Sequence, residues 1–205
     1  WLYEKYNFGI KPAMIRHELE NLTETGYLEQ PYHSAGRVPS DRAYEVFTSR
    51  ILENNDEPNL EENFMRPFRT TDWPEFLSAF SNHLGILGAL EEEAEERVYK
   101  TGLEVLLNRL NWENPSNIKS IIRDFEELDE RVENFKQKID EDAPMRIYIG
   151  RKSPITESRD LSVIIQKCSI DGENILLMAI GPKRMNYKKV VETFKSIKNV
   201  NGWRK

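Results

Sequence analysis

The sequence predicts an α+β protein in two folded parts. Three observations predict this class. Within the first 52 residues, two segments with helical periodicity flank a loop rich in glycine, proline and serine. Longer helical patterns fill the middle of the chain, and three short runs of Ile, Leu and Val precede a last helix. The predicted bounds are an N-terminal domain over 1–52, a polar linker over 53–71 and a C-terminal domain over 72–205.

The first helix is expected to run from Pro12 to Thr25, since proline is favoured in the first turn of a helix and Gly26 stands just past its end. Its apolar residues recur at i, i+4 and i+7, which predicts one buried stripe formed by Ile15, Leu19 and Leu22.

A short extended segment begins at Tyr27 and Leu28 and breaks at Pro31. The stretch 32–39 (YHSAGRVP) lacks helical period and is typical of a loop or hairpin tip. Ser40 or Asp41 can cap a second helix, whose apolar face is formed by Tyr44, Phe47 and Ile51. Helix, strand, basic loop and helix in this order predict a winged helix-turn-helix.

The middle of the chain is predicted to be helical and acidic. Segment 53–71 is polar and contains two prolines, which indicates a linker. From Asp72 a helix is expected, and it is expected to continue through the acidic run 91–96 towards Leu110. Pairs at i, i+4, Glu93 with Arg97 and Glu96 with Lys100, favour a solvated helix face for this run over a metal or partner site.

A second helix is predicted after Pro115, with an apolar heptad pattern at positions three and four residues apart: Ile118, Ile121, Phe125, Leu128, Val132, Phe135 and Ile139. Such a seam indicates either a short coiled coil between two chains or a helix packed inside its own domain. The pattern alone leaves both interpretations open.

The last sixty residues predict a small α/β module. Three strands are expected over 146–150, 161–168 and 174–181, with a hairpin at Asp171 and Gly172. A closing helix is expected over Asn186–Lys198.

Composition limits the classes of function. Apolar runs are far shorter than the ~20 residues of a membrane helix, and the chain opens without a charged and apolar leader, so a cytoplasmic location is expected. Cys168 is the only cysteine, which excludes a disulfide framework. The chain begins with Trp1 inside a short predicted helix, from which we expect further residues upstream.

Enzymatic function and a cofactor are not expected. The chain has three histidines, His17, His33 and His83, without the spacing of metal ligands, and it lacks a phosphate-binding loop and a nucleophile elbow. Net charge is −6 in total but unevenly spread: −1 over 1–52, −13 over 53–145 and +8 over 146–205. A DNA reader in the first segment would therefore depend on a few placed cations.

Segment 12–40 (PAMIRHELENLTETGYLEQPYHSAGRVPS) resembles the signature of the HrcA family of heat-inducible repressors, with Ser-Ala-Gly-Arg-Val-Pro as the specific part. The C-terminal strings RIYIGRKSP, LSVIIQKC and IGPKRMNYKKV resemble the effector module of the same family, and VYKTGLEVLL resembles the segment before it. The resemblance covers most of the chain.

This resemblance implies a transcriptional repressor of chaperone genes that binds an inverted-repeat operator in double-stranded DNA as a homodimer, with a GroEL-type chaperonin as partner. It also implies a GAF-like C-terminal domain. Family members have about 25–30 further residues before the equivalent of Trp1, and a longer stretch between about Phe80 and Glu95 that holds half of that domain and an inserted dimerisation domain. We therefore expect a truncated GAF-like domain, and a dimer contact through the heptad helix or the C-terminal module.

In a winged helix, the residues at the start of the recognition helix face base edges in the major groove. The predicted contacts there are Lys11, Ala13, Met14, Arg16 and His17, with an Arg16–Glu20 ion pair as the structural alternative for Arg16. In the loop, Gly36 allows close approach, Arg37 is expected at the tip, and His33 and Ser34 could donate to phosphates. A degenerate homologue that senses a protein or ligand without binding DNA is the alternative.

Overall fold

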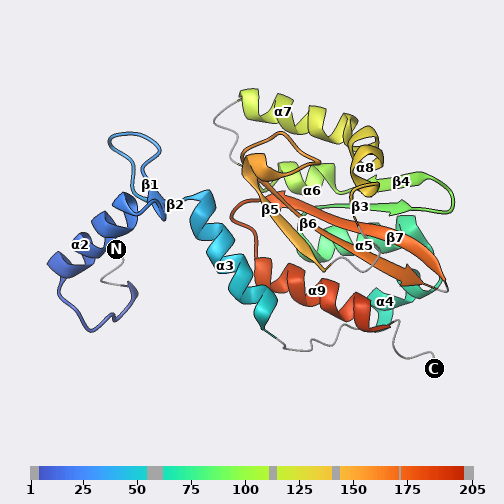
Figure 1. Cartoon of the computed structure of the whole chain (residues 1–205), viewed down its shortest axis with the longest axis horizontal. Coiled ribbons are helices and arrows are strands. Elements are labelled where there is room, and N and C mark those ends of the chain that lie inside the picture. Colours follow the sequence, from blue (N-terminus) through green and yellow to red (C-terminus); the bar gives the residue numbers. More distant parts are fainter. Residues whose placement is uncertain (1–4, 55–61, 111–114, 140–143, 171, 201–205) are drawn as a thin grey trace. The chain divides into compact units, whose positions relative to one another are not determined.

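The computed structural model describes residues 5–54, 62–110, 115–139, 144–170 and 172–200 (Figure 1). The chain divides into two compact units, residues 1–49 and residues 50–205. They are named unit 1 and unit 2 and are described separately.

Unit 1 contains helix α2 (Pro12–Glu24), strands β1 (Leu28–Glu29) and β2 (Val38–Pro39), and most of helix α3 (Asp41–Glu53). The two strands pair antiparallel, with Leu28 opposite Pro39, so the segment between them is a hairpin loop. The predicted helix bounds and the loop are confirmed. Ser40 caps α3, because its Oγ accepts a hydrogen bond from the Ala43 amide at 3.3 Å.

The predicted buried stripe on α2 is wrong in its degree of burial. Among the described residues of unit 1 only Thr48 is buried. Ile15 and Leu19 are half-buried and Leu22 is 39% exposed, while Phe47 on α3 is 53% exposed. In the described part of this unit, α2, α3 and a hairpin of two-residue strands offer too little apolar surface to enclose a core of their own.

The predicted linker over 53–71 is wrong in its C-terminal part. Helix α4 (Glu62–Arg69) occupies it and buries Met65 and Phe68 against the next helix, α5 (Trp73–Leu84). The Phe68 ring lies 5.0 Å from Phe76 between centroids. Met65 and Phe68 stand three residues apart on one helix face, a short apolar pattern that the surrounding polar residues and Pro67 obscure.

The centre of unit 2 is a five-stranded antiparallel sheet in the order β4-β3-β7-β6-β5. Its bounds are β3 (Leu87–Glu92), β4 (Arg97–Thr101), β5 (Arg146–Ile149), β6 (Leu161–Ile170) and β7 (Glu173–Pro182). The three predicted strands and the β6–β7 hairpin are confirmed. β3 and β4 complete the sheet on its other side, and the sequence did not predict these two strands.

The expected long helix over residues 72–110 is also wrong. Helix α5 ends at Leu84 because Gly85 adopts a left-handed conformation with φ 67°, which glycine tolerates and other residues rarely do. The chain then forms the β3–β4 hairpin and the short helix α6 (Leu103–Leu107). In β3 all six residues are buried, so both faces of this strand are covered.

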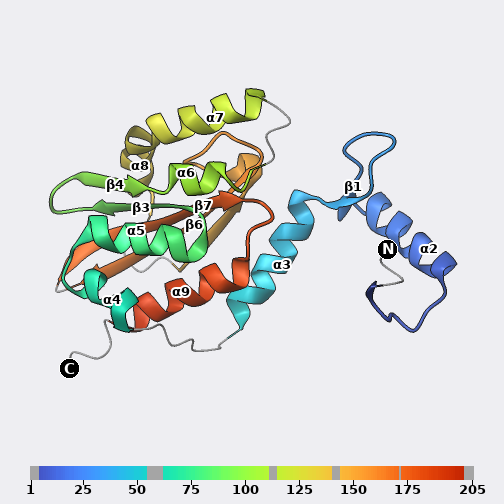
Figure 2. The same cartoon turned by 180° about the vertical axis from the view of Figure 1, so that it is seen from behind.

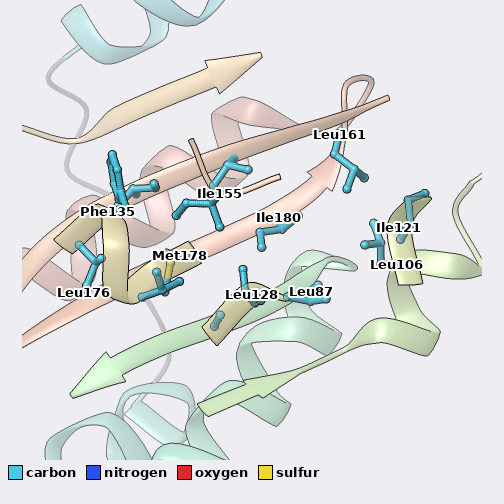
Figure 3. Close-up of a cluster of buried hydrophobic side chains, with 14 of the residues drawn as sticks. Leu87, Leu106, Ile121, Leu128, Phe135, Ile155, Leu161, Leu176, Met178 and Ile180 are labelled. Atoms are coloured by element: carbon cyan, nitrogen blue, oxygen red, sulfur yellow. The ribbon is translucent and has the colours of Figure 1, made fainter. Parts of the chain in front are cut away.

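Helices cover both faces of the sheet (Figures 1 and 2). Helix α5 and the closing helix α9 (Tyr187–Val200) share one face, where the rings of Phe80 and Phe194 lie 5.8 Å apart. Helices α6, α7 (Pro115–Glu126) and α8 (Leu128–Lys136) cover the other face. Figure 3 shows the apolar cluster between them, in which side chains of α8 such as Leu128 and Phe135 meet Leu176, Met178 and Ile180 of β7.

The heptad helix is divided into α7 and α8, and its seam packs inside unit 2. Ile121, Leu128, Val132, Phe135 and Ile139 are all buried in the cluster of Figure 3. The intramolecular interpretation is therefore confirmed, and this seam is not available for a coiled coil between chains.

The acidic run 91–96 does not form a solvated helix face. Glu91 and Glu92 are 2% and 7% exposed in β3, and the remaining residues of the run form the exposed β3–β4 turn. Lys136 Nζ donates to Glu91 Oε1 at 2.9 Å, and Trp73 Nε1 donates to Glu92 Oε1 at 2.9 Å. Each buried carboxylate thus has a specific donor, as buried charge requires.

Among the described residues, no helix is both long and apolar enough to span a lipid bilayer.

Candidate nucleic-acid interface

The N-terminal half of α2 presents an exposed polar surface. Lys11 is the N-cap residue, with an extended backbone, and its carbonyl oxygen accepts hydrogen bonds from Met14 N at 2.9 Å and Ile15 N at 3.2 Å. All five predicted contacts on this helix are exposed: Lys11, Ala13, Met14, Arg16 and His17. Among the described residues, Arg16 forms no ion pair with Glu20 or any other carboxylate. The structural alternative for Arg16 is therefore wrong, and its guanidinium is available to a ligand.

The C-terminal end of α2 is fixed to the start of α3. Gly26 has a φ of 77°, and Tyr27 N reaches back to the carbonyl oxygen of Leu22 at 2.8 Å, which closes the helix end. Arg42 Nη1 donates to the carbonyl oxygen of Thr25 at 2.8 Å, and its guanidinium lies over the Tyr27 ring at 4.5 Å. Ser40 Oγ donates to the carbonyl oxygen of Gly26 at 2.6 Å. These bonds set the angle between α2 and the hairpin that follows it.

One side chain, that of Gln30, bridges two backbone carbonyl groups of the loop between β1 and β2. Gln30 Nε2 donates to the carbonyl oxygens of His33 and Ala35, each at 2.8 Å. The predicted contacts His33, Ser34, Gly36 and Arg37 are all exposed. An added Cβ at Gly36 would meet nothing within 4 Å, so the loop surface is open there.

Arg37 is not at the tip of the loop, where it was expected. It precedes β2 directly, and its Nε donates to Thr23 Oγ1 of α2 at 3.1 Å. β2 begins at Val38, which is paired with Glu29, so the hairpin closes immediately after Arg37. Arg37 thus ties the loop to α2 while its side chain remains exposed.

Sequence reasoning missed three residues that organise this surface: Thr23, Gln30 and Arg42. Each forms a hydrogen bond with a residue between 3 and 17 positions away in the sequence. These bonds are exposed, so they leave no periodic pattern of apolar residues in the sequence. The only available sign was that each is a hydrogen-bonding side chain next to a predicted helix end or strand end.

The charge of unit 1 is low for a nucleic-acid interface. Residues 1–49 carry five basic and seven acidic side chains, a net charge of −2. Any affinity of this unit for phosphate must come from the positions of Lys11, Arg16 and Arg37 rather than from its overall field.

Unit 2 contains a second polar cluster, which anchors the loop between β5 and β6. Asp124 of α7 accepts hydrogen bonds from Glu157 N at 2.8 Å, Ser158 N at 3.0 Å and Arg131 Nη1 at 2.9 Å. Burial raises the pKa of the Asp124 carboxyl, although these three donors act in the opposite direction. Despite burial, the hydrogen bond to Glu127 and the charge of Asp124 raise the pKa of Arg131.

This cluster has the features of a structural anchor. A pocket of about 300 Å³ lies beside it, lined by Arg131, Asn134, Phe135, Lys138, Ser153, Pro154, Thr156 and Glu157. Arg131 is held by Asp124, Glu127 and Glu157, which leaves its charge compensated. No group of three or more metal-ligating side chains occurs among the described residues.

Residues 48–191 of this chain match the family described as the HrcA protein C-terminal domain. Two curated relatives are heat-inducible transcription repressors HrcA. The protein of Thermoanaerobacter sp. (strain X514) is 50% identical over 62 residues, which is 29% of this chain and 18% of that protein. The protein of Caldanaerobacter subterraneus subsp. tengcongensis is 55% identical over 51 residues, 25% of this chain and 15% of that protein. The matched segments thus span less than a fifth of these relatives.

One solved structure shares the fold. It is a crystal structure described as that of a hypothetical protein, with a TM-score of 0.69 and 14% sequence identity, and it covers 97% of this chain and 88% of the other. At this identity the match concerns the fold alone. The five-stranded sheet with helices on both faces fits the GAF-like C-terminal domain that the sequence resemblance implied.

Proposed function

Since the chain belongs to the HrcA family of heat-inducible transcription repressors, we propose that unit 1 is a winged-helix DNA reader and that the protein represses chaperone genes. The single observation that carries the proposal is the surface of α2. Its first two turns expose Lys11, Arg16 and His17, and Arg16 is not neutralised by a carboxylate of the described chain.

In this proposal α2 is the recognition helix. The major groove of B-DNA is wide enough to admit a helix, and each base pair displays a distinct pattern of donors and acceptors there. Arg16 would bind guanine or a phosphate, Lys11 a phosphate at the helix start, and Ala13 a thymine methyl group. Met14 and His17 flank these positions and would adjust the preferred sequence.

The β1–β2 loop is the proposed wing. His33 and Ser34 would donate to phosphate oxygens, and the open surface at Gly36 would let the backbone approach DNA closely. Arg37 has a double role in this account: its bond to Thr23 holds the wing against the recognition helix, and its exposed guanidinium lies where the two elements meet.

Two copies of the reader are needed for useful affinity. One bidentate base contact is worth about 1–3 kcal/mol, and a single module makes only a few. An inverted-repeat operator and a homodimer supply the second set of contacts. Because the heptad seam is buried inside unit 2, the remaining candidate for the dimer contact is another surface of the C-terminal domain. A GroEL-type chaperonin is the proposed protein partner, as the resemblance implied.

A mobility-shift titration on the promoter of the host's own chaperone genes tests the reader. Arg16→Ala is expected to weaken operator binding by about 10-fold to 100-fold, the equivalent of about 1–3 kcal/mol, and to relax sequence preference. Thr23→Val is a matched positioning variant: it removes the hydroxyl that accepts from Arg37 Nε and donates to the Leu19 carbonyl oxygen within α2, and it replaces none of the proposed DNA-contacting residues. Binding that ignores sequence in the wild-type protein would refute the proposal.

A sensor without DNA binding is the second candidate. The observation that favours it is the net charge of −2 over residues 1–49, which is low for a DNA-binding unit. A wild-type protein that binds neither operator nor unrelated DNA at low salt, yet still binds chaperonin, would favour this candidate.

A further inference from the structure

One end of the sheet in unit 2 gathers cations from separate segments. β5 ends beside the start of β6, with Ile149 opposite Ser162, and β7 ends beside the same start, with Pro182 opposite Leu161. The turn after β7 is joined to the segment before β6, because Lys183 N donates to the carbonyl oxygen of Asp160 at 3.0 Å. This geometry brings three exposed arginines to one end: Arg151, Arg159 and Arg184.

Arg109 reaches the same end from the other side of the sheet. It follows α6 and packs on Gly85, where an added Cβ would lie 2.2 Å from the Arg109 guanidinium carbon. Gly85 directly precedes Ile86 and β3, whose first residue, Leu87, is paired with Ile180 near the end of β7. Further cations on these segments complete what is named the basic end: Arg109, Arg151, Lys152, Arg159, Lys183, Arg184 and Lys188.

Carboxylates only partly compensate this charge. Asp160 accepts a hydrogen bond from Asn117 at 2.7 Å, and Glu157 pairs with Arg131 at 3.2 Å. Glu192 lies 3.6 Å from Lys188, and Glu104 stands in the first turn of α6. Among the described residues, no ion pair joins a carboxylate to any of four arginines of the basic end: Arg109, Arg151, Arg159 and Arg184.

The opposite end of the sheet is acidic. The β3–β4 turn lies beside the β6–β7 hairpin, since Glu93 N donates to the carbonyl oxygen of Asn174 at 3.1 Å. Exposed carboxylates there belong to Glu93, Glu95, Glu96 and Glu173, and one exposed cation, Arg97, follows the same turn. In Figure 1 these hairpins lie at the right of the sheet, whereas the turn from β7 into α9 lies at its left. Charge is therefore separated along the strands, which packing of the apolar core does not require.

We propose that the basic end of unit 2 binds DNA phosphates next to the operator. The inference rests on the proposed function, and it supplies what unit 1 lacks, because residues 1–49 have a net charge of −2. Arginine binds phosphate oxygens through paired hydrogen bonds, and each phosphate neutralised releases counterions, which makes binding stronger at low salt. The acidic end would turn away from DNA by repulsion and so orient the domain.

The test is a salt titration of the full chain on operator DNA and on a scrambled duplex of the same length. The variant Arg151→Glu/Arg184→Glu reverses two exposed charges of the basic end. The matched control is Arg97→Glu/Lys198→Glu, two exposed cations on β4 and α9 outside the basic end, with the same change in net charge. Circular dichroism and thermal melting confirm that both variants fold.

The basic-end variant is expected to lose affinity for both duplexes by the same factor, at least about tenfold at low salt, with the operator preference unchanged. The slope of log K against log salt should fall by about 2, near 0.9 for each lost phosphate contact, while the control keeps the wild-type slope.

If the wild type prefers the operator and the basic-end variant keeps the wild-type slope of log K against log salt, this inference is wrong and the proposed function stands. Sequence-blind binding by the wild type, with a reduced slope in the variant, would overturn the proposed function and support the basic end. If sedimentation shows that the variant loses self-association while its DNA slope is unchanged, the basic end binds the acidic end of a second copy, and the inference is wrong.

Discussion

Removal of the Lys136 ammonium should destabilise unit 2 far more than a surface charge would. Glu91 lies on β3, between β4 and β7, with its side chain 3% exposed, and Lys136 Nζ is 2.9 Å from its Oε1. Lys136→Met keeps the aliphatic stem but leaves a buried carboxylate without a counter-charge. Loss of one partner of a buried pair costs about 3–5 kcal/mol. For a chain of this size, that is about 6–20 °C in melting temperature.

Urea unfolding of single and double variants measures this cost. Glu91→Leu/Lys136→Met removes both charges together and should recover most of the loss, because the buried carboxylate is gone. Lys188→Met is the matched control: it breaks the exposed Lys188–Glu192 pair and should change stability by about 0–1 kcal/mol. Hydrogen bonds to Glu133 and Glu91 raise the pKa of Lys136, so the ammonium of the wild-type protein stays charged at neutral pH. A loss below about 1 kcal/mol for Lys136→Met would refute the reasoning.

Three further outcomes are expected. Burial raises the pKa of the Cys168 thiol to about 12, so the thiol stays protonated near pH 8 and should react with a disulfide reagent only after unfolding; rapid labelling of native protein would contradict this. Gly102→Ala should cost more than about 1 kcal/mol in thermal melting, since Gly102 has a φ of 89° and an added Cβ would lie 2.6 Å from the Ile86 carbonyl oxygen, whereas Gly36→Ala should be nearly neutral. Asp124→Ala leaves the amides of Glu157 and Ser158 without their acceptor, so stability should fall by about 1–3 kcal/mol and limited proteolysis should cut the β5–β6 loop first; unchanged proteolysis would argue against the anchor.

The sequence predicted the parts of the fold where one kind of periodicity is uninterrupted. Pro12 and Gly26 mark the ends of α2 through backbone geometry alone, and the apolar runs of β6 and β7 are bounded by turn residues. These local signals do not depend on tertiary contacts. The same reasoning failed from Gly85 to Thr101, because a left-handed glycine and two buried glutamates resemble a helix with a charged face until their partners are known.

The candidate site was predictable in position but not in internal organisation. The motif around residues 12–40 identified the exposed helix start and the loop, and these positions are solvent-exposed in the structure. The placement of Arg37 depended on Thr23, fourteen residues earlier, and the loop shape depended on Gln30. Such bonds are set by three-dimensional proximity, which a single sequence does not encode as a pattern.

A footprint of the full chain on the promoter of its host's chaperone genes tests the central claim most directly. The account predicts protection of two inverted half-sites separated by about one helical turn or a multiple of it, about 34–36 Å from centre to centre, and loss of that protection in Arg16→Ala. Uniform protection along the duplex, or protection that Arg16→Ala leaves unchanged, would contradict the claim that α2 reads DNA sequence.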